Sequence, residues 1–320
     1  MIILTGGAGF IGSCFLKRLN LEGISDVMVV DDIKDPAKEK NLRGKTYLGY
    51  VQKDDFLKQV KNKKAPVAEI IVHMGACSST IETDTDYIMR NNYEYSKSLL
   101  EWALEHNTRF IYASSAATYG DGSFGFSDSD ENTKRLKPLN PYGNSKHLFD
   151  LWVMDNGLID KVTGIKFFNV FGPNEYHKGE MRSIVCKKYK EILDTGKIAL
   201  FKSYSKDYAD GEQKRDFVYI KDAVEIMWHL FKNPEITGIF NLGTGIARTW
   251  NDLAKAMFFA MDVKPRIEYI DMPVEIRDRY QYFTQADMAK LRATKCPAHF
   301  RPLEESVKDY ITYLKVGSYI

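Results

Sequence analysis

Cysteine is scarce in this sequence of 320 residues, occurring only at Cys14, Cys77, Cys186 and Cys296. There is no C-x-x-C pair, and no arrangement of cysteines and histidines has the spacing of a four-ligand zinc site. We therefore expect four buried thiols in a reducing cytoplasm, with neither disulfides nor a bound metal.

Long apolar runs and blocks of like charge are also missing. The longest apolar stretches, such as AMFFAM (256–261), are far shorter than the about 20 residues that cross a bilayer. The N-terminal MIIL leads directly into glycines, so no signal peptide is expected. The formal net charge is only +2 at pH 7. These features predict a cytoplasmic protein that binds neither membrane nor nucleic acid.

Short β-rich runs alternate with helical stretches through the first half of the chain. The predicted strands cover residues 1–5, 27–31, 69–75, 109–115 and 164–170. They are almost continuously apolar, which is typical of parallel strands covered by helices on both faces. The sequence therefore predicts an α/β fold with a doubly wound parallel sheet of the Rossmann type.

The alternation stops after residue 170, which predicts a second, smaller domain of mixed structure. We expect residues 1–170 to form a dinucleotide-binding domain and residues 171–320 to form a substrate-binding domain. The segment 215–245 contains two further β-rich runs. We expect this segment to return to the sheet of the first domain.

A glycine-rich turn, TGGAGFIG, follows the first predicted strand and opens a helix. Gly6, Gly9 and Gly12 stand where a Cβ would block the tight turn, the approach of a pyrophosphate, or helix packing. The helix N-terminus presents free N–H groups to phosphates. Asp31 closes the second predicted strand, where a carboxylate can bind ribose hydroxyls. Together these features predict a dinucleotide site.

The residues near Asp31 leave the choice between NAD and NADP open. Asp31 itself favours NAD, because a carboxylate repels a 2′-phosphate. Lys34, Lys38 and Lys53 follow in the sequence and can offset that charge. They are equally compatible with solvated lysines on a loop.

The segment PYGNSK places Tyr142 and Lys146 on one face of a predicted helix. A phenol with a pKa near about 10 is a poor base at neutral pH, but a neighbouring ammonium favours the phenolate. Ser115, at the end of the fourth predicted strand, can hydrogen-bond the same substrate oxygen. The three residues predict hydride transfer between a sugar carbon and a nicotinamide, with Tyr142 as the base.

These motifs resemble those of the extended short-chain dehydrogenases/reductases that act on nucleotide sugars. Within that group the sequence is most similar to the ADP-L-glycero-D-manno-heptose 6-epimerases, from Met1 into the last predicted helix. The stretches that carry this similarity are HMGACSSTIETD, NPYGNSK, FFNVFGPNEYHKGEM, GEQKRDFVYIKD, IFNLGTGIARTWNDLA and RYQYFTQAD. The resemblance implies epimerisation at C6″ of an ADP-heptose through a 6″-keto intermediate, with a nicotinamide cofactor that stays bound.

The resemblance also implies roles for individual residues. Catalysis is assigned to Tyr142, Lys146, Ser115 and Lys178. Besides the three glycines of the turn, the implied cofactor positions are Phe10, Ile11, Asp31, Asp32, Lys38, Lys53, Met74, Gly75, Ala76, Cys77, Ser78, Asn92, Lys146, Val170 and Lys178. The implied ADP-sugar positions are Asn169, Glu180, Lys187, Phe201, Lys202, Ser203, Tyr204, Arg215 and Tyr280.

Two positions depart from the pattern of the family. Asp32 stands where asparagine is common and adds negative charge where a 2′-phosphate would lie. Lys187 stands where relatives carry a histidine. The resemblance implies NADP as the cofactor, with NAD as the alternative, and a homo-oligomer, with a pentamer as one form. It also implies a role in assembly of the lipopolysaccharide inner core.

The loop GPNEYHKGEM (172–181) generates the most specific prediction. Hydride removal from one face and return to the other puts the ketone oxygen in two positions, and each position needs an acid/base. Tyr142 can serve only one of them. Lys178 is predicted to serve the other. His177 is the alternative because its ordinary pKa suits neutral pH, and an idle surface lysine is the third interpretation.

Four other functions compete with epimerisation at C6″. A dehydratase of this fold places Asp and Glu directly after the catalytic hydroxyl residue, whereas Ala116 and Ala117 follow Ser115 here. A 4-epimerase does not need the HKG loop, and a dehydrogenase would release reduced cofactor. A non-catalytic dinucleotide sensor would be expected to lose part of the Ser–Tyr–Lys triad.

Overall fold

Three sheets organise the chain, for which the computed structural model describes residues 1–277, 280–297 and 299–320. The strands are β1 (Ile2–Thr5), β2 (Val27–Asp31), β3 (Gly49–Gln52), β4 (Ile70–His73), β5 (Arg109–Ser115), β6 (Val162–Phe167), β7 (Asn169–Phe171), β8 (Ile198–Phe201), β9 (Lys214–Tyr219), β10 (Gly238–Leu242), β11 (Ala247–Thr249) and β12 (Ile267–Ile270). The first four predicted strands are present, whereas the predicted strand 164–170 is divided between β6 and β7, which belong to different sheets. Strand β3 is an addition.

Helices connect these strands. They are α1 (Phe10–Leu21), α2 (Pro36–Glu39), α3 (Lys53–Lys61), α4 (Thr85–Ile88), α5 (Tyr95–Glu105), α6 (Asp130–Thr133), α7 (Pro141–Asp155), α8 (Ile184–Thr195), α9 (Ile220–Lys232), α10 (Trp250–Met261), α11 (Val274–Arg277), α12 (Ala289–Ala293) and α13 (Leu303–Val316). Short 3-10 helices cover Lys40–Leu42, Ala116–Tyr119 and Tyr176–Met181, and a π-helical segment covers Met89–Glu94.

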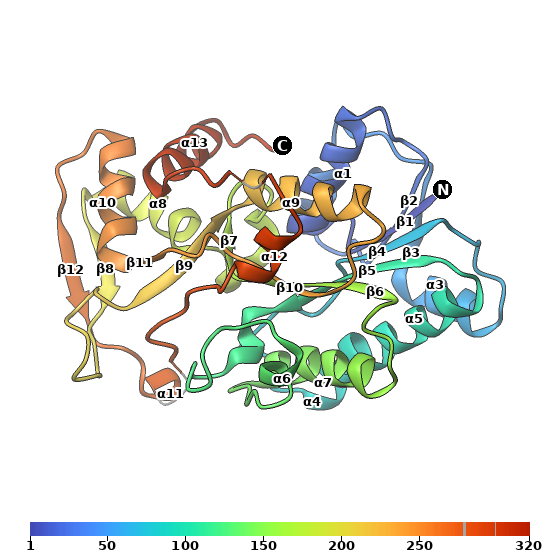
Figure 1. Cartoon of the computed structure of the whole chain (residues 1–320). Coiled ribbons are helices and arrows are strands. Elements are labelled where there is room, and N and C mark those ends of the chain that lie inside the picture. Colours follow the sequence, from blue (N-terminus) through green and yellow to red (C-terminus); the bar gives the residue numbers. More distant parts are fainter. Residues whose placement is uncertain (278–279, 298) are drawn as a thin grey trace.

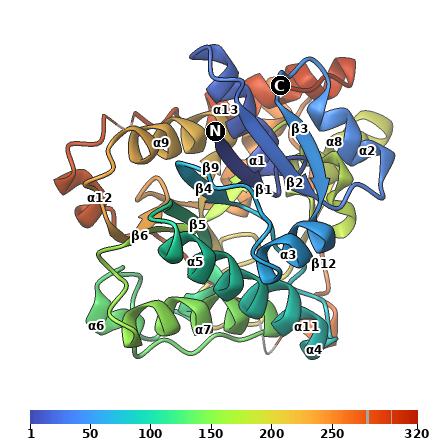
Figure 2. The ribbon, with the colours of Figure 1, turned by 90° about the vertical axis from the view of Figure 1, so that its right-hand side faces the viewer.

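The largest sheet has seven parallel strands in the order β10-β6-β5-β4-β1-β2-β3. The order runs outward in both directions from the neighbours β1 and β4, which creates a crevice at the carboxyl ends of these two strands. Helices α1 and α9 cover one face, and α3, α5 and α7 cover the other (Figures 1 and 2). The predicted doubly wound Rossmann-type fold is confirmed.

Alternating residues of the central strands build two cores. On β1, Leu4 packs into the core beneath α1 and α9, whereas Ile3 packs into the core beneath α3 and α5. Both side chains are completely buried. Because each strand is covered on both sides, apolar residues occupy successive positions, as the sequence pattern indicated.

The second half of the chain builds a smaller mixed unit at the carboxyl edge of the large sheet (Figure 1). One of its sheets has the order β11-β9-β7, and the other pairs β12 with β8. The expected return of 215–245 to the large sheet is therefore only half right: β10 joins it beside β6, whereas β9 pairs with β7 and β11. Both runs are apolar, so their pattern alone could not separate the two sheets.

The expectation of four buried thiols is wrong for three of them. Cys14 is buried on the inner face of α1, whereas Cys77, Cys186 and Cys296 are partly exposed. Cys77 lies in a loop that follows β4, where the backbone borders a cavity rather than the core. Within the part of the chain that the structure describes, no helix has the length and apolarity needed to cross a membrane.

Candidate active site

The glycine-rich turn between β1 and α1 forms one wall of the site. A Cβ on Gly12 would lie 2.2 Å from the carbonyl oxygen of Gly6, and a Cβ on Gly6, whose φ is +68°, would lie 2.6 Å from the amide nitrogen of Gly75. These two glycines are thus required for the turn itself. A Cβ on Gly9 would contact only the Gly6 carbonyl group, whose oxygen would lie 3.0 Å from that Cβ. Gly9 otherwise faces open space.

That space is a cavity of about 250 Å³ between the turn and α7. The predicted cofactor residues that line it are Gly6, Gly9, Phe10, Ile11, Gly12, Asp31, Lys38, Met74, Gly75, Ala76, Ser78, Lys146, Val170 and Lys178. Ser115 and Tyr142 line it too. An adjoining cavity of about 160 Å³ includes Asp32, Lys53 and Cys77. The shape and the bare backbone at Gly9 fit a dinucleotide whose pyrophosphate lies against the turn.

Asn92 is the one predicted cofactor residue that lines neither cavity. Its side chain is buried and accepts a hydrogen bond from the backbone amide of Cys77 at 2.8 Å. Its amide group donates to the Cys77 carbonyl and to Ser145 Oγ, both at 3.0 Å. Asn92 thus fixes the loop that borders the cofactor cavities and has no hydrogen-bonding capacity directed at them.

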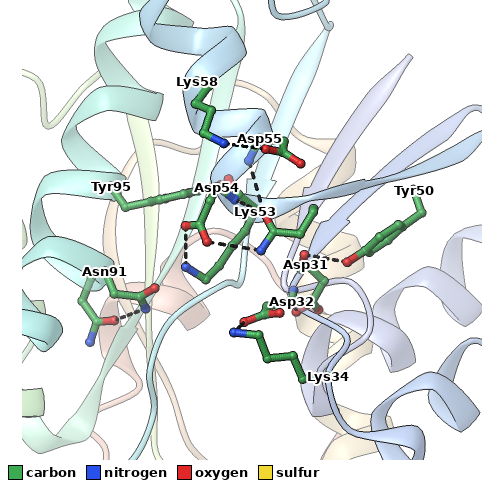
Figure 3. A network of polar contacts seen from close by, with 12 residues as sticks. Asp31, Asp32, Lys34, Tyr50, Lys53, Asp54, Asp55, Lys58, Asn91 and Tyr95 are labelled. Carbon is green, nitrogen blue, oxygen red and sulfur yellow. Dashed lines mark hydrogen bonds and ion pairs between the residues drawn. The ribbon is translucent and has the colours of Figure 1, made fainter.

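Asp31 ends β2 at the far end of the cavity. One carboxylate oxygen accepts the Ala8 amide of the glycine-rich turn at 2.8 Å. The other accepts the amide of Asp32 at 2.7 Å and pairs with the ammonium of Lys38. Tyr50 donates to the Asp31 carbonyl at 2.9 Å, a contact drawn in Figure 3. The buried carboxylate therefore ties β2 to the turn.

The predicted triad is brought together beside the same cavity. Ser115 ends β5, and α7 carries Tyr142 and Lys146 one turn apart. Burial lowers the pKa of Lys146 to about 8, and the carboxylate of Asp150 opposes this shift. Burial raises the pKa of Tyr142, and a hydrogen bond with Ser115 opposes that rise. The phenol is therefore a proton donor at neutral pH unless a further positive charge joins it.

Asp150, one turn after Lys146, was not identified from the sequence. Its carboxylate accepts hydrogen bonds from Tyr112 at 2.9 Å and from Ser114 at 2.7 Å, both on β5. It also forms an ion pair of 2.6 Å with Lys166 on β6, and both charged side chains have no exposed area. The network fixes α7 against the strand that ends at Ser115.

The predicted loop lysine lies at the junction of two cavities. Lys178 lines the cofactor cavity and also a larger cavity of about 690 Å³. Burial lowers the pKa of Lys178, and the carboxylate of Glu175 opposes this change. Gly179 follows with φ +52°, a left-handed conformation that favours glycine. Lys178 thus lies where the two cavities meet rather than on an open surface loop.

Glu175 holds the two ends of this loop together and was not predicted from the sequence. Its buried carboxylate accepts the backbone amide and the hydroxyl of Ser183, each at 2.6 Å. Ser183 caps α8 by accepting the amide of Cys186 at 3.3 Å. The lysine loop is therefore anchored to the start of α8.

His177 does not have the ordinary pKa on which its role as an alternative acid was based. Burial lowers its pKa to about 4, and the positive charges of Lys38 and Lys178 act in the same direction. The imidazole is therefore neutral at pH 7. The expectation of a pKa suited to proton transfer near neutrality is wrong.

The larger cavity collects five of the predicted substrate residues: Asn169, Glu180, Lys187, Arg215 and Tyr280. It also has lining residues that sequence reasoning missed, among them Asn140, Arg182, Trp250 and Gln281. These four residues were not predicted because they lie outside the quoted motifs or at motif positions to which no role was assigned. Arg279, which begins the RYQYFTQAD stretch, lies outside the described residues.

The predicted substrate run Phe201, Lys202, Ser203 and Tyr204 does not line this cavity. Lys202 instead forms an ion pair with Asp271 at 3.0 Å. Tyr204 donates to the same carboxylate at 3.1 Å, and the guanidinium of Arg277 lies 3.8 Å from its ring centroid. The run thus contacts the segment that follows β12 and does not line the cavity.

Arg215 provides positive charge inside the larger cavity. It is 6% exposed and has no carboxylate partner within the described parts of the chain. Its guanidinium donates to the Lys214 carbonyl at 2.9 Å and lies 5.1 Å from the Tyr280 ring and 5.7 Å from the Trp250 ring. A buried cation without a counter-charge is costly, so the arrangement favours an anionic ligand.

Comparison with known proteins agrees with this geometry. The model of the NAD dependent epimerase/dehydratase family matches residues 2–243. The ADP-L-glycero-D-manno-heptose-6-epimerase of Nitratidesulfovibrio vulgaris (strain Hildenborough) is 55% identical over 97% of both chains. The chain belongs to the ADP-L-glycero-D-manno-heptose-6-epimerase family. A second member of the family, from Fusobacterium nucleatum, is 46% identical over the full length of both chains.

Solved structures share the same architecture. The crystal structure of the Helicobacter pylori ADP-L-glycero-D-manno-heptose-6-epimerase superposes with a TM-score of 0.82 at 27% identity, covering 98% of this chain and 96% of that one. A UDP-N-acetylglucosamine 4-epimerase from Methanobrevibacter ruminantium also reaches 0.82, at 21% identity with 99% and 98% coverage. The second likeness concerns the fold alone. Membership of the epimerase family makes the chain an enzyme.

A substitution at Gly9 is expected to affect cofactor binding without affecting folding. We expect Gly9→Val to fold and to lose its bound nicotinamide nucleotide, because the side chain would fill the space at the turn. The nucleotide released from purified protein by denaturation is the measurement. Gly49→Val on β3 is the matched control, since a Cβ there would meet only the Met28 side chain, at 3.6 Å or more. Full nucleotide content in Gly9→Val would contradict the assignment.

Proposed function

We propose that the protein epimerises C6″ of ADP-D-glycero-β-D-manno-heptose to give ADP-L-glycero-β-D-manno-heptose through a 6″-keto intermediate. The observation that carries the proposal is the position of Lys178, which lines both the cavity of Tyr142 and the larger cavity of Arg215. Two acid/base groups from different parts of the chain thus border one reaction volume. The 6-epimerase relatives support the substrate.

The two half-reactions need these groups in turn. A nicotinamide nucleotide held against the glycine-rich turn would supply the hydride acceptor and donor for C6″. Tyr142, held on α7 beside Lys146, exchanges the hydroxyl proton for one orientation of the heptose side chain. After the ketone turns over, its oxygen lies on the other side, where Lys178 exchanges the proton. Burial lowers the pKa of Lys178, so it releases a proton more readily than an ordinary lysine does.

Two substitutions test this mechanism. Tyr142→Phe and Lys178→Met should each reduce epimerisation by about 10²–10⁴, the usual effect of losing an acid/base group. The measurement is stereochemistry at C6″ by NMR after incubation with ADP-D-glycero-β-D-manno-heptose, alongside nucleotide content and thermal unfolding. Lys190→Met, which removes an exposed lysine from α8, is the control. Near wild-type epimerisation by Lys178→Met would contradict the two-base mechanism.

The same assay separates epimerisation from its rivals. A dehydrogenase would reduce added NAD or NADP in proportion to sugar consumed, whereas the proposed reaction leaves added cofactor unchanged. A dehydratase would remove water from the sugar. Ala116 and Ala117, which follow Ser115, provide no acidic group for that step.

Arg215 is proposed to bind the pyrophosphate of the ADP-heptose. A planar guanidinium donates bidentately to phosphate oxygens, and no carboxylate within the described residues competes for it. Tyr280 and Trp250, which flank it, offer aromatic surface for the adenosine half.

Removal of this charge should weaken substrate binding selectively. Arg215→Ala should raise KM by about tenfold or more, as expected for a lost hydrogen bond to a charged group, while nucleotide content stays unchanged. Arg215→Lys should recover only part of the loss because lysine lacks the guanidinium fork. Arg248→Ala is the control: Arg248 lies opposite Arg215 on β11 but pairs with Asp252 and Glu304. An unchanged KM in Arg215→Ala would contradict the assignment.

We propose NADP as the preferred cofactor, with NAD accepted. Figure 3 shows the charges that surround the end of β2. Lys38 is paired with buried Asp31, Lys34 lies 3.1 Å from Asp32, and Lys53 lies 2.7 Å from Asp54. Each acidic side chain is offset by a lysine. Lys38 and Lys53 both line the adjoining cavity, where a bound 2′-phosphate would share them with these carboxylates.

Asp32 is the acidic residue that works against this preference. Asp32→Asn should raise the ratio of NADP to NAD affinity by about fivefold or more, since removing a like charge near a phosphate is worth about 1 kcal/mol or more. Binding of each nucleotide to stripped protein is the measurement. Asp55→Asn, which removes a surface partner of Lys58, is the matched control. An unchanged ratio of NADP to NAD affinity would mean that the 2′-phosphate of NADP does not lie near Asp32.

Three further proposals rest on the family resemblance. We propose that the enzyme works in the cytoplasm, that it assembles as a homo-oligomer, with a pentamer as one form, and that its product serves assembly of the lipopolysaccharide inner core. The oligomer is testable by light scattering of the purified full chain.

A further inference from the structure

Asn41 connects two parts of the site that are distant in sequence. It lies in the 3-10 helix Lys40–Leu42, and its side chain is fully buried. Its amide nitrogen donates to the Ala8 carbonyl of the glycine-rich turn at 2.9 Å and to the Asn174 carbonyl of the lysine loop at 3.0 Å. Carbonyl oxygens only accept hydrogen bonds. These two contacts therefore fix which end of the Asn41 amide is the nitrogen.

The orientation of Asn41 also fixes the protonation of His177. The Asn41 amide nitrogen lies 3.2 Å from His177 Nδ1. The two hydrogens of this amide nitrogen are directed at the Ala8 and Asn174 carbonyls, and an amide nitrogen does not accept hydrogen bonds. An N–H at Nδ1 would therefore face this nitrogen without an acceptor, which favours the form with no hydrogen on Nδ1. A neutral imidazole carries one N–H. The hydrogen of His177 is therefore on Nε2.

The surroundings of His177 keep it in this neutral form. Lys38 and Lys178 lie near the ring and disfavour its protonation, while Asp31 and Asp35 act in the opposite direction. Burial adds to the effect of the lysines and dominates the balance. The described parts of the chain contain no hydrogen-bond partner for Nε2, and the side chain lines the cofactor cavity.

We propose that His177, locked in its Nε2–H tautomer by Asn41, donates a hydrogen bond to the backbone of the bound dinucleotide. This inference rests on the proposed function for the identity of the ligand. His177 is a binding residue in this role and takes no part in proton transfer. Lys178 is the next residue in the chain, so this contact also restrains the loop segment that carries the lysine.

NMR of the full chain with ¹⁵N-labelled histidine tests the tautomer directly. We expect the His177 ring, assigned by its loss in His177→Gln, to show a protonated Nε2 and an unprotonated Nδ1 at pH 7, and to keep this state down to about pH 5 because the pKa is lowered to about 4. A proton on Nδ1, or titration near the ordinary value of about 6.5, would overturn the proposal.

Binding of NADPH, followed by its fluorescence, tests the donor role. His177→Phe keeps a planar ring without an N–H and should weaken binding by about 2- to 12-fold, the range of one neutral hydrogen bond. His177→Gln restores an N–H donor and should recover most of this loss. His106→Phe, on a histidine that lines no described cavity, is the control. Equal affinity of His177→Phe and wild type would overturn the donor role.

The outcomes distinguish this inference from the proposed function. Tight NADPH binding with no effect of His177→Phe contradicts the inference alone. Failure of the wild type to epimerise ADP-D-glycero-β-D-manno-heptose contradicts the proposed function, whereas the tautomer and the dependence of NADPH binding on His177 would still stand.

Discussion

The carboxylate of Asp150 is the buried charge on which the geometry of the reaction centre depends. It accepts hydrogen bonds from two residues of β5 and an ion pair from Lys166 on β6 while standing on α7. Removing one partner of a fully buried pair typically costs about 3–5 kcal/mol, because the other charge is left without compensation. These contacts thereby fix the position of α7 along β5. The same contacts therefore determine the distances between Ser115 on β5 and the two α7 residues, Tyr142 and Lys146.

The parts of the site that the sequence predicted are those built from neighbours in the chain. The glycine-rich turn and the Tyr142–Lys146 pair each lie within a single turn or helix, where spacing alone determines geometry. Their supports were not predictable in the same way. Asn41 contacts a residue 133 positions away, and a lone asparagine next to a lysine-rich stretch carries no pattern that marks such a contact.

Placement of charged and aromatic residues was predicted less well where tertiary packing decides it. The 201–204 run carries polar and aromatic groups suited to a nucleotide, yet Lys202 and Tyr204 are engaged by Asp271 outside the cavity. His177 has an ordinary sequence context, but its environment moves its pKa far from the reference value. Desolvation depends on what other segments cover, which spacing along the chain does not encode.

The direct connection between β6 in the large sheet and β7 in the second sheet has a mechanical consequence. The chain runs from β6 in the large sheet through Phe168 directly into β7, which pairs with β9 in the second sheet. Phe168 and Val170 line both cavities along this path. Sliding one sheet past the other would strain Phe168, the single residue that joins β6 to β7. The two sheets are thus joined by one buried residue where the two cavities meet. In the proposed reaction, the rotation that exposes the second face of the ketone is therefore assigned to the heptose side chain, about its bond to the ring.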